Sequence, residues 1–294
     1  MKTLILALLV SFTAVAQDDV ARELKRFENV EGTIPRLEAF SQVYLGLPYG
    51  AGGPLGEGPT GRYDQDPLWR FDTYDCTTFV ETMLSLAHAR TPEEFQAHMR
   101  EIRYENGVIG YVERNHDPSL NWIPNNIANG YLTDLTRTLA PASVVKVASA
   151  LIDWPRHYRM KKMEELRVFD VPRSELPARL EEWRQEGERL GAIPSTLDYI
   201  PVDWIVQQNP SMLARIPNGS VVNMVRPNWD LTDIIGTHMN VSHQGLVFQR
   251  GGRTWLRHAS STGTNNVREE LFLEYLKKYV GHPTLKGIHV MGVQ

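Results

Sequence analysis

The chain of 294 residues contains one cysteine, Cys76, so no disulfide can form within it. Its fold must therefore be held together by a hydrophobic core. With 42% hydrophobic and 22% charged residues, the composition is typical of a globular protein that has such a core. The length is compatible with one large domain or two. A net charge of -4 gives no basic surface of the kind that binds nucleic acid.

The first sixteen residues have the pattern of a secretory signal peptide. Lys2 gives a basic start, an apolar run extends from Leu4 to Phe12, and small residues precede Gln17. A membrane span needs about 20 apolar residues, and this run is much shorter. We therefore expect signal-peptide residues 1–16 and an exported, periplasmic or secreted, mature chain without a membrane span.

In exported proteins most cysteines are paired, so a single one is either a small buried hydrophobic residue or a reactive thiol. After Cys76, apolar residues recur at helical spacing, which predicts a helix from about Cys76 to His88 with Asp75 as its N-cap. The N-terminus of a helix favours the thiolate, the form of cysteine that acts as a nucleophile. Cys76 is therefore a candidate catalytic residue.

The remainder of the chain falls into three regions of different pattern. Residues 20–130 mix helical patterns with glycine-rich turns, residues 131–200 look helical and highly charged, and residues 215–294 have the pattern of strands and a late helix. Within the second region, residues 154–191 predict one or two solvated helices that cover the core. A role of this charged segment in binding a ligand is the alternative.

A β-hairpin is predicted over residues 241–261, with its turn at residues 251–252. Pairing the residues on either side of this turn places His258 opposite Gly245, and His243 lies two residues farther along the same face. Diagonal neighbours in a sheet are about 7 to 8 Å apart, and a glycine opposite His258 leaves room for its ring. The two histidines are therefore expected to meet.

A thiol at a helix start and two histidines on one hairpin face are the groups that a thiol acyl-transfer enzyme needs. Cys76 would attack a carbonyl, His243 would take and return the proton, and His258 would orient His243. The backbone N–H of Cys76 would stabilise the oxyanion. No H-E-x-x-H motif occurs, so we expect no metal and no cofactor.

Two other motifs match only by their letters. Residues 56–61 fit G-x-G-x-x-G, but Pro59 and the missing preceding strand argue against a dinucleotide site. The glycosylation pattern at Asn240 adjoins the predicted base, and we interpret it as accidental.

Four segments together resemble the NlpC-type cell-wall peptidases, a papain-like superfamily. They are GLPYGAGG (46–53), YDCTTFVETMLSLA (74–87), VSHQGLV (241–247) and WLRHASS (255–261). Within it, the chain is most similar to the N-acetylmuramoyl-L-alanine amidase-like group, formerly a domain of unknown function. That group is marked by the segments DCTTFVE (75–81), IRY (102–104) and NWIPNN (121–126). The resemblance spans residue 44 to the C-terminus.

The resemblance implies an α+β, papain-like NlpC-type fold, in which a Cys-bearing helix packs on an antiparallel sheet. It implies a single domain over residues 17–294, with a largely helical insertion near 105–215. By position, the nucleophile, base and third polar residue of the family fall on Cys76, His243 and His258. The serine at Ser220 departs from the family, which usually has an acidic residue there.

The same resemblance gives a set of candidate substrate contacts. They are Tyr49, Asp75, Thr77, Trp122 and Ser242. Three of them have structural alternatives, because Tyr49 and Trp122 fit equally well into a core and Asp75 is a good helix cap.

The function implied is that of an exported cysteine amidase. It would cleave the bond between N-acetylmuramic acid and L-alanine in peptidoglycan or in its anhydro-muropeptide fragments. A γ-D-glutamyl-diamino acid endopeptidase has the same catalytic groups, because specificity depends on the pocket. A non-catalytic muropeptide-binding protein is the third interpretation, but the complete set of nucleophile, base and orienting residue favours an enzyme.

Overall fold

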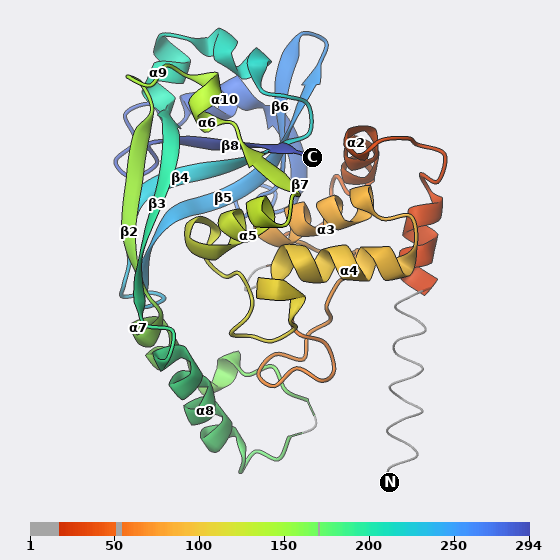
Figure 1. Cartoon of the computed structure of the whole chain (residues 1–294), viewed down its shortest axis with the longest axis vertical. Helices are drawn as coiled ribbons and strands as arrows, with labels where there is room; N and C mark the ends of the chain where they lie inside the picture. Colours follow the sequence, from red (N-terminus) through yellow and green to blue (C-terminus); the bar gives the residue numbers. More distant parts are fainter. Residues whose placement is uncertain (1–17, 51–54, 170) are drawn as a thin grey trace.

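The computed structural model describes residues 18–50, 55–169 and 171–294, so the expected signal peptide lies outside the described residues. In the part described, eight strands form one antiparallel sheet with the order β2-β3-β8-β4-β5-β6-β7, and β1 pairs with β8 (Figure 1). The strands are β1 (Leu132–Asp134), β2 (Lys146–Asp153), β3 (Ala192–Pro201), β4 (Ser220–Leu231), β5 (Thr237–Arg250), β6 (Arg253–Ala259), β7 (Val267–Leu271) and β8 (Gly287–Val293).

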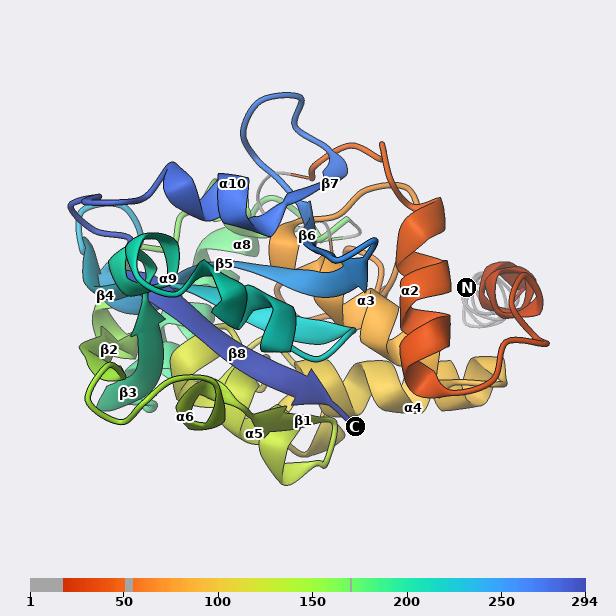
Figure 2. The same ribbon diagram turned by 90° about the horizontal axis from the view of Figure 1, so that it is seen from above.

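Helices pack on both faces of this sheet (Figure 2). The α-helices are α2 (Thr33–Val43), α3 (Cys76–His88), α4 (Pro92–Arg103), α5 (Ile123–Ala128), α6 (Thr136–Leu139), α7 (Trp154–Arg159), α8 (Leu176–Glu188), α9 (Val202–Gln207) and α10 (Phe272–Lys277). Short 3-10 or π turns are η1 (Glu105–Gly107), η2 (Pro118–Trp122), η3 (Met163–Glu165) and η4 (Pro210–Arg215). This mixture of helices and an antiparallel sheet confirms the expected α+β class.

Helix α3 begins at Cys76 and ends at His88, as the apolar spacing predicted. At its start Asp75 Oδ1 accepts a hydrogen bond from the Thr78 N–H at 2.7 Å, and the Asp75 N–H donates to Thr78 Oγ1 at 3.0 Å. This reciprocal pair satisfies donors that a helix start otherwise leaves free. Helix α3 therefore starts at a defined residue, and the thiol lies on its first turn.

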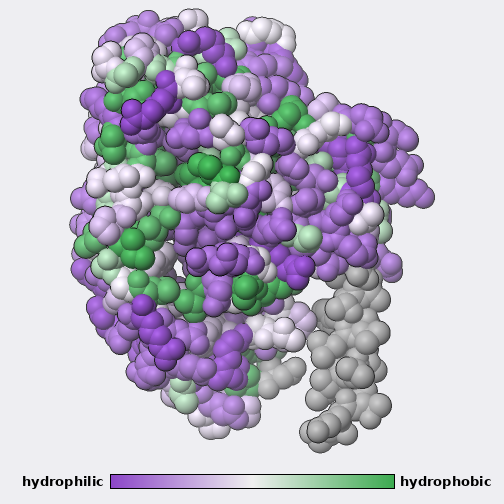
Figure 3. Space-filling view, viewed as in Figure 1, coloured by the Kyte–Doolittle hydropathy of each residue, from purple (hydrophilic) through white to green (hydrophobic). Residues whose placement is uncertain are grey.

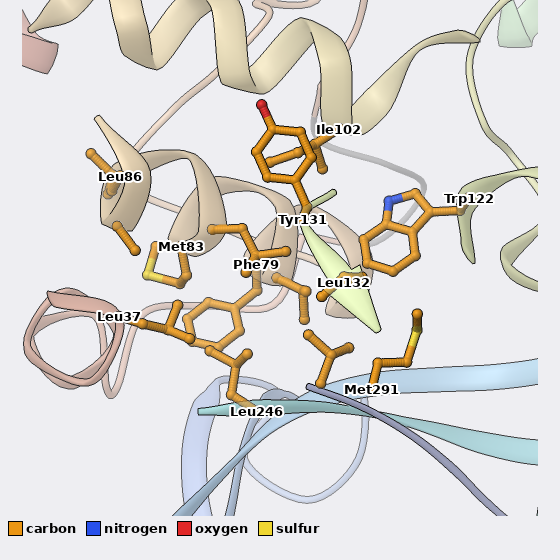
Figure 4. Close-up of a cluster of buried hydrophobic side chains, with 14 of the residues drawn as sticks. Leu37, Phe79, Met83, Leu86, Ile102, Trp122, Tyr131, Leu132, Leu246 and Met291 are labelled. Atoms are coloured by element: carbon orange, nitrogen blue, oxygen red, sulfur yellow. The ribbon is translucent and has the colours of Figure 1, made fainter. Parts of the chain in front are cut away.

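The core between α3 and the sheet fixes the position of that turn. In Figure 4, Phe79 and Met83 of α3 point toward Leu37 of α2 and Leu246 of β5. Alternate residues of the strands serve the opposite core, where Val247 packs with α9 and α10. Because both faces of the central strands are buried, α3 cannot shift along the sheet without breaking close packing.

The insertion near residues 105–215 is not largely helical, contrary to expectation. It contains β1 and also β2 and β3, which pair from Lys146↔Tyr199 to Asp153↔Ala192 at one edge of the sheet. Exposed positions alternate with buried ones along β2 because one of its faces is open to solvent. The exposed face carries Val147, Ser149 and Leu151, so polar and apolar residues do not alternate along β2, and the sequence showed no strand pattern there.

The predicted helices of residues 154–191 are present as α7 and α8. They cover a small core that contains Trp154, Tyr158 and Trp183. The face of the molecule in Figure 3 is mostly hydrophilic, with hydrophobic residues scattered over it. None of the described helices combines the length and the hydrophobicity that crossing a membrane requires.

Candidate active site

Cys76 lies against strand β5, at the residue that follows the predicted base. Its Sγ accepts a hydrogen bond from the backbone N–H of Gln244 and lies 4.0 Å from Thr77 Oγ1. Cys76 and His243 both belong to the described residues, and no hydrogen bond joins Sγ to the ring there. The thiol is thus adjacent to the backbone of β5 beside His243.

The thiol is protonated in this resting arrangement. Burial raises the pKa of Cys76 to about 11, and the nearby Asp75 carboxylate adds to the effect. Hydrogen bonds from Gln244 and Thr77 lower the pKa, but by less. Desolvation of the anion therefore opposes the preference for the thiolate that was expected from the helix start.

His243 and His258 meet as the hairpin register predicted. The strands pair from Arg250↔Arg253 to Leu246↔Arg257, and His243 Nε2 lies 2.6 Å from His258 Nδ1. Burial lowers the pKa of His243 to about 3, and repulsion by a protonated His258 contributes next. His243 is therefore a neutral imidazole, the form that can accept a proton.

A third strand adds Glu270, which the sequence analysis missed. Glu270 Oε1 lies 3.2 Å from His258 Nε2, and Lys278 Nζ lies 2.6 Å from Glu270 Oε2. The pKa of Glu270 is lowered to about 2, first by the hydrogen bond from His258 and then by Lys278, against the opposing effect of burial. Extending the predicted hairpin to β7 would have indicated it, since Arg268 pairs with His258 and Glu270 is two residues away.

These contacts determine the tautomers of both histidines. Because Glu270 is a carboxylate and accepts hydrogen bonds only, His258 donates to it through Nε2–H. His258 Nδ1 is then an acceptor and takes the Nε2–H of His243. The remaining nitrogen of His243, Nδ1, carries a free lone pair, so the arrangement presents a general base.

Gly245 leaves the space that the histidine pair needs. A Cβ at this position would lie 2.8 Å from Leu256 Cδ1 and 3.1 Å from both Arg257 O and His258 Cβ. We expect Gly245→Ala to displace His258, to cost about 1 to 3 kcal/mol of stability through overpacking and to lower kcat by about tenfold. Urea unfolding and steady-state kinetics measure the two effects.

Gly292→Ala is the matched control for this prediction. It also lies in the sheet, but its Cβ would meet only the flexible end of Leu135, at 3.0 Å. It should change stability without changing kcat. An equal loss of kcat in both variants would contradict the role assigned to Gly245.

Tyr49 lies near the nucleophile. Its side chain is half-buried, the Cys76 thiolate is among the groups that raise the pKa of its hydroxyl after burial itself, and it hydrogen-bonds with Ser261. Ser242 lies at a bulge of β5 and accepts a hydrogen bond from Arg226 Nε at 3.0 Å.

Trp122 is buried in the core, so the substrate contact expected for its side chain is not possible in this structure. Its side chain is 0% exposed, and its indole Nε1–H donates to Glu81 Oε1 at 3.0 Å. Glu81 also forms a buried ion pair with Arg103 at 2.8 Å. A large aromatic ring with one polar atom satisfied inside the core is part of the packing. Asn240 is likewise 0% exposed, so it is inaccessible to glycosylation in the fold.

Asp75 is a helix cap, and a second role can be tested. Asp75→Ala should cost about 1 kcal/mol of stability because it removes the cap. Thr91→Ala is the matched control, since Thr91 caps α4 through the same reciprocal arrangement with Glu94. If Asp75 only caps, both variants lose similar stability in thermal unfolding and keep the KM of the wild type. A rise in KM for Asp75→Ala alone would show that it also contacts substrate.

Neither a metal site nor the cavity between α5 and α7 coincides with these residues in the described part of the chain. In the described ranges no group of three His, Cys, Asp or Glu side chains is placed to hold a metal ion. A cavity of about 460 Å³ lies between α5 and α7, lined by Asn121, Asn125 and Trp154 among others. The lining contains none of the predicted catalytic residues, so the candidate site is defined by its chemistry and not by cavity size.

Comparisons with known proteins support the amidase-like part of the resemblance. The family model described as AmiA-like, N-acetylmuramoyl-L-alanine amidase-like, matches residues 39–282. No curated protein matches the chain. The solved structure of a Legionella pneumophila protein, from a family named as a domain of unknown function, is 34% identical with a TM-score of 0.89. The matched region covers 97% of this chain and 96% of the Legionella protein.

Two further structures share the fold at lower identity. An N-acetylmuramoyl-L-alanine amidase from Bacteroides uniformis is 22% identical with a TM-score of 0.60, over 89% of this chain and 99% of its own. A putative xylanase from Bacteroides fragilis is 25% identical with a TM-score of 0.59, over 85% and 98%. From the family match over most of its length, this chain belongs to the AmiA-like family of N-acetylmuramoyl-L-alanine amidase-like proteins.

Proposed function

We propose that this protein is a cysteine-dependent cell-wall amidase that cleaves the amide bond between the lactyl group of N-acetylmuramic acid and L-alanine. Its family membership supports an amidase-like activity on peptidoglycan or its fragments. The observation that supports the cysteine mechanism is the position of Cys76 against the backbone of β5 at Gln244, the residue after His243. The His243 ring in turn contacts His258, and His258 contacts Glu270. The signal-peptide pattern of residues 1–16 supports export to the compartment that contains this substrate.

The proposed reaction begins with transfer of the Cys76 thiol proton to His243 Nδ1 as sulfur attacks the lactyl carbonyl carbon. The backbone N–H of Cys76, on the first turn of α3, would donate to the oxyanion. His243 then protonates the alanine nitrogen, the C–N bond breaks and the peptide leaves as an amine. Water, activated by His243, hydrolyses the thioester, which releases the lactyl carboxylate and restores the thiol.

The neutral resting pair leads to a specific pH dependence. Because burial lowers the pKa of His243 to about 3, the base stays unprotonated below the ordinary histidine pKa of 6.5. We expect kcat/KM to stay constant from pH 7 to about 5 and to fall only at lower pH, as His243 gains a proton. Initial rates, with circular dichroism at each pH as a control for folding, measure this. An acid limb centred near 6.5 would contradict it.

We also assign the chain to the NlpC-type papain-like superfamily. A helix with the cysteine on its first turn, packed on an antiparallel sheet that presents two histidines, supports this assignment. The same groups would serve a γ-D-glutamyl-diamino acid endopeptidase, which is the competing activity. A muropeptide-binding protein without catalysis has no need for the thiol and histidine series, so we favour an enzyme.

Mass spectrometry of defined substrates tests the proposal. Residues 17–294 are incubated with a disaccharide tripeptide and with its anhydro form, beside the Cys76→Ala variant. Release of free tripeptide by the wild type alone supports the amidase. Cleavage within the peptide would move the enzyme to the endopeptidase class, and no cleavage of either substrate would favour the binding protein.

A further inference from the structure

Arg226 of β4 is a partly buried cation, and no acidic residue within the described ranges pairs with it. Its Nε donates to Ser242 Oγ at 3.0 Å, its Nη1 donates to Thr284 Oγ1, and its guanidinium lies 5.0 Å from the centre of the Trp229 ring. Across the described residues, no carboxylate forms an ion pair with Arg226. Two neutral hydroxyls and an aromatic face hold the side chain in place without cancelling its charge.

The arginines that are fully buried in the described residues have partners that replace water. Arg103 pairs with Glu81 at 2.8 Å, and Arg257 pairs with Glu269 at 2.5 Å. Arg36 donates to four backbone carbonyls. Removing a guanidinium from water costs free energy unless such partners replace the water. Burial lowers the pKa of Arg226, with only tyrosines to oppose it, so its site lacks an anion.

The position of Arg226 relates it to the reaction. Ser242, which binds its Nε, directly precedes His243 on β5. On β4, Arg226 comes two residues after Met224, the residue that pairs with His243 across the sheet. Arg226 is therefore bound to the residue of β5 that adjoins the predicted base.

One nitrogen of the guanidinium remains available to a ligand. Nε and Nη1 are occupied by the two hydroxyls, whereas Nη2 has no hydrogen-bond partner in the described part of the chain and is not among its buried unsatisfied atoms. A guanidinium N–H forms strong, charge-assisted hydrogen bonds with carboxylate and phosphate oxygens, and the proposed substrate carries carboxylates. The missing anion is thus best supplied by a carboxylate of the substrate.

We propose that Arg226 forms a subsite for the α-carboxylate of D-glutamate in the stem peptide. This rests on the proposed function, in which the bond before L-alanine is cut. The next residue is joined through its γ-carboxyl, which leaves its α-carboxylate as the free anion nearest the reacting bond. Ser242 and Trp229 hold the guanidinium in the orientation that receives it.

Two substrates that differ in one group test the subsite. They are muramoyl tripeptides with D-glutamate or with its α-amide, D-isoglutamine, at the second position. For the wild type we expect KM to be about tenfold higher for the amide, because a charge-assisted hydrogen bond is lost. Arg226→Gln should raise KM for the carboxylate by about tenfold and remove the discrimination, with kcat within about twofold of the wild type.

Control experiments distinguish the loss of this subsite from a loss of folding and from a failure of the proposed function. Arg253→Gln removes an exposed arginine at the hairpin turn and should keep the discrimination of the wild type. Equal KM values for both substrates in the wild type, or discrimination that persists in Arg226→Gln, would overturn the subsite. If the wild type cleaves neither substrate, the proposed function fails. Calorimetry with the Cys76→Ala protein then decides the subsite, and equal affinities for the two ligands would overturn it.

Discussion

Replacing Cys76 by alanine should lower kcat/KM on the muramoyl peptide by about 10⁴-fold or more, since the covalent route is lost and only binding and oxyanion stabilisation remain. Cys76→Ser should lose nearly as much activity. Its hydroxyl is a far weaker acid than the thiol, and His243, whose pKa is lowered to about 3, is too weak a base to activate it efficiently. Release of tripeptide, followed by mass spectrometry, measures both variants.

Neither variant should alter the fold, because the cap of α3 is made by Asp75 and Thr78 and not by Cys76. Thermal unfolding within about 1 kcal/mol of the wild type is therefore the control. If Cys76→Ala kept even a tenth of the wild-type rate, the thiol would not be the nucleophile.

The parts of the site that sequence could predict are those governed by local chemistry. The cap at Asp75 and the apolar spacing after it defined the start of α3 to the residue. The two glycines of the hairpin turn, both with positive φ, determined the register that brings His243 to His258. Each of these signals acts over a few residues, so one sequence contains all the information needed.

The parts that could not be predicted depend on contacts between distant segments. Glu270 reaches His258 only because β7 returns beside β6. The pKa of Cys76 depends on burial by the whole site, and a helix-dipole argument has no means of weighing that burial. Trp122 lies in an asparagine-rich segment that looks like a surface, but the core around Glu81 takes up its ring. Strand β2 is an edge strand, whose pairing with β3 spans α7 and α8.

Replacing Glu270 by glutamine should lower kcat by about 100-fold with a much smaller change in KM. The amide can donate as well as accept, so it no longer forces His258 to carry its proton on Nε2. Once His258 can carry the proton on Nδ1, it repels the Nε2–H of His243, and His243 Nδ1 is no longer kept as the free acceptor that the proposed mechanism needs. Steady-state kinetics and ¹⁵N NMR of the two imidazoles report the rate and the tautomers.

A merely structural role for Glu270 would change stability but not the tautomers. Glu270→Asp keeps the charge, so it should recover part of kcat and the wild-type ¹⁵N shifts, although its shorter side chain lengthens the contact with His258. Glu269→Gln is the matched control on the same strand, because Glu269 binds Arg257 on the opposite face and does not contact either histidine. It should lose stability, since it leaves the buried Arg257 with a weaker partner, and keep both the ¹⁵N shifts and the KM. Wild-type tautomers in Glu270→Gln, or equal losses of kcat in Glu269→Gln and Glu270→Gln, would contradict the proposal that this carboxylate orients the base through His258.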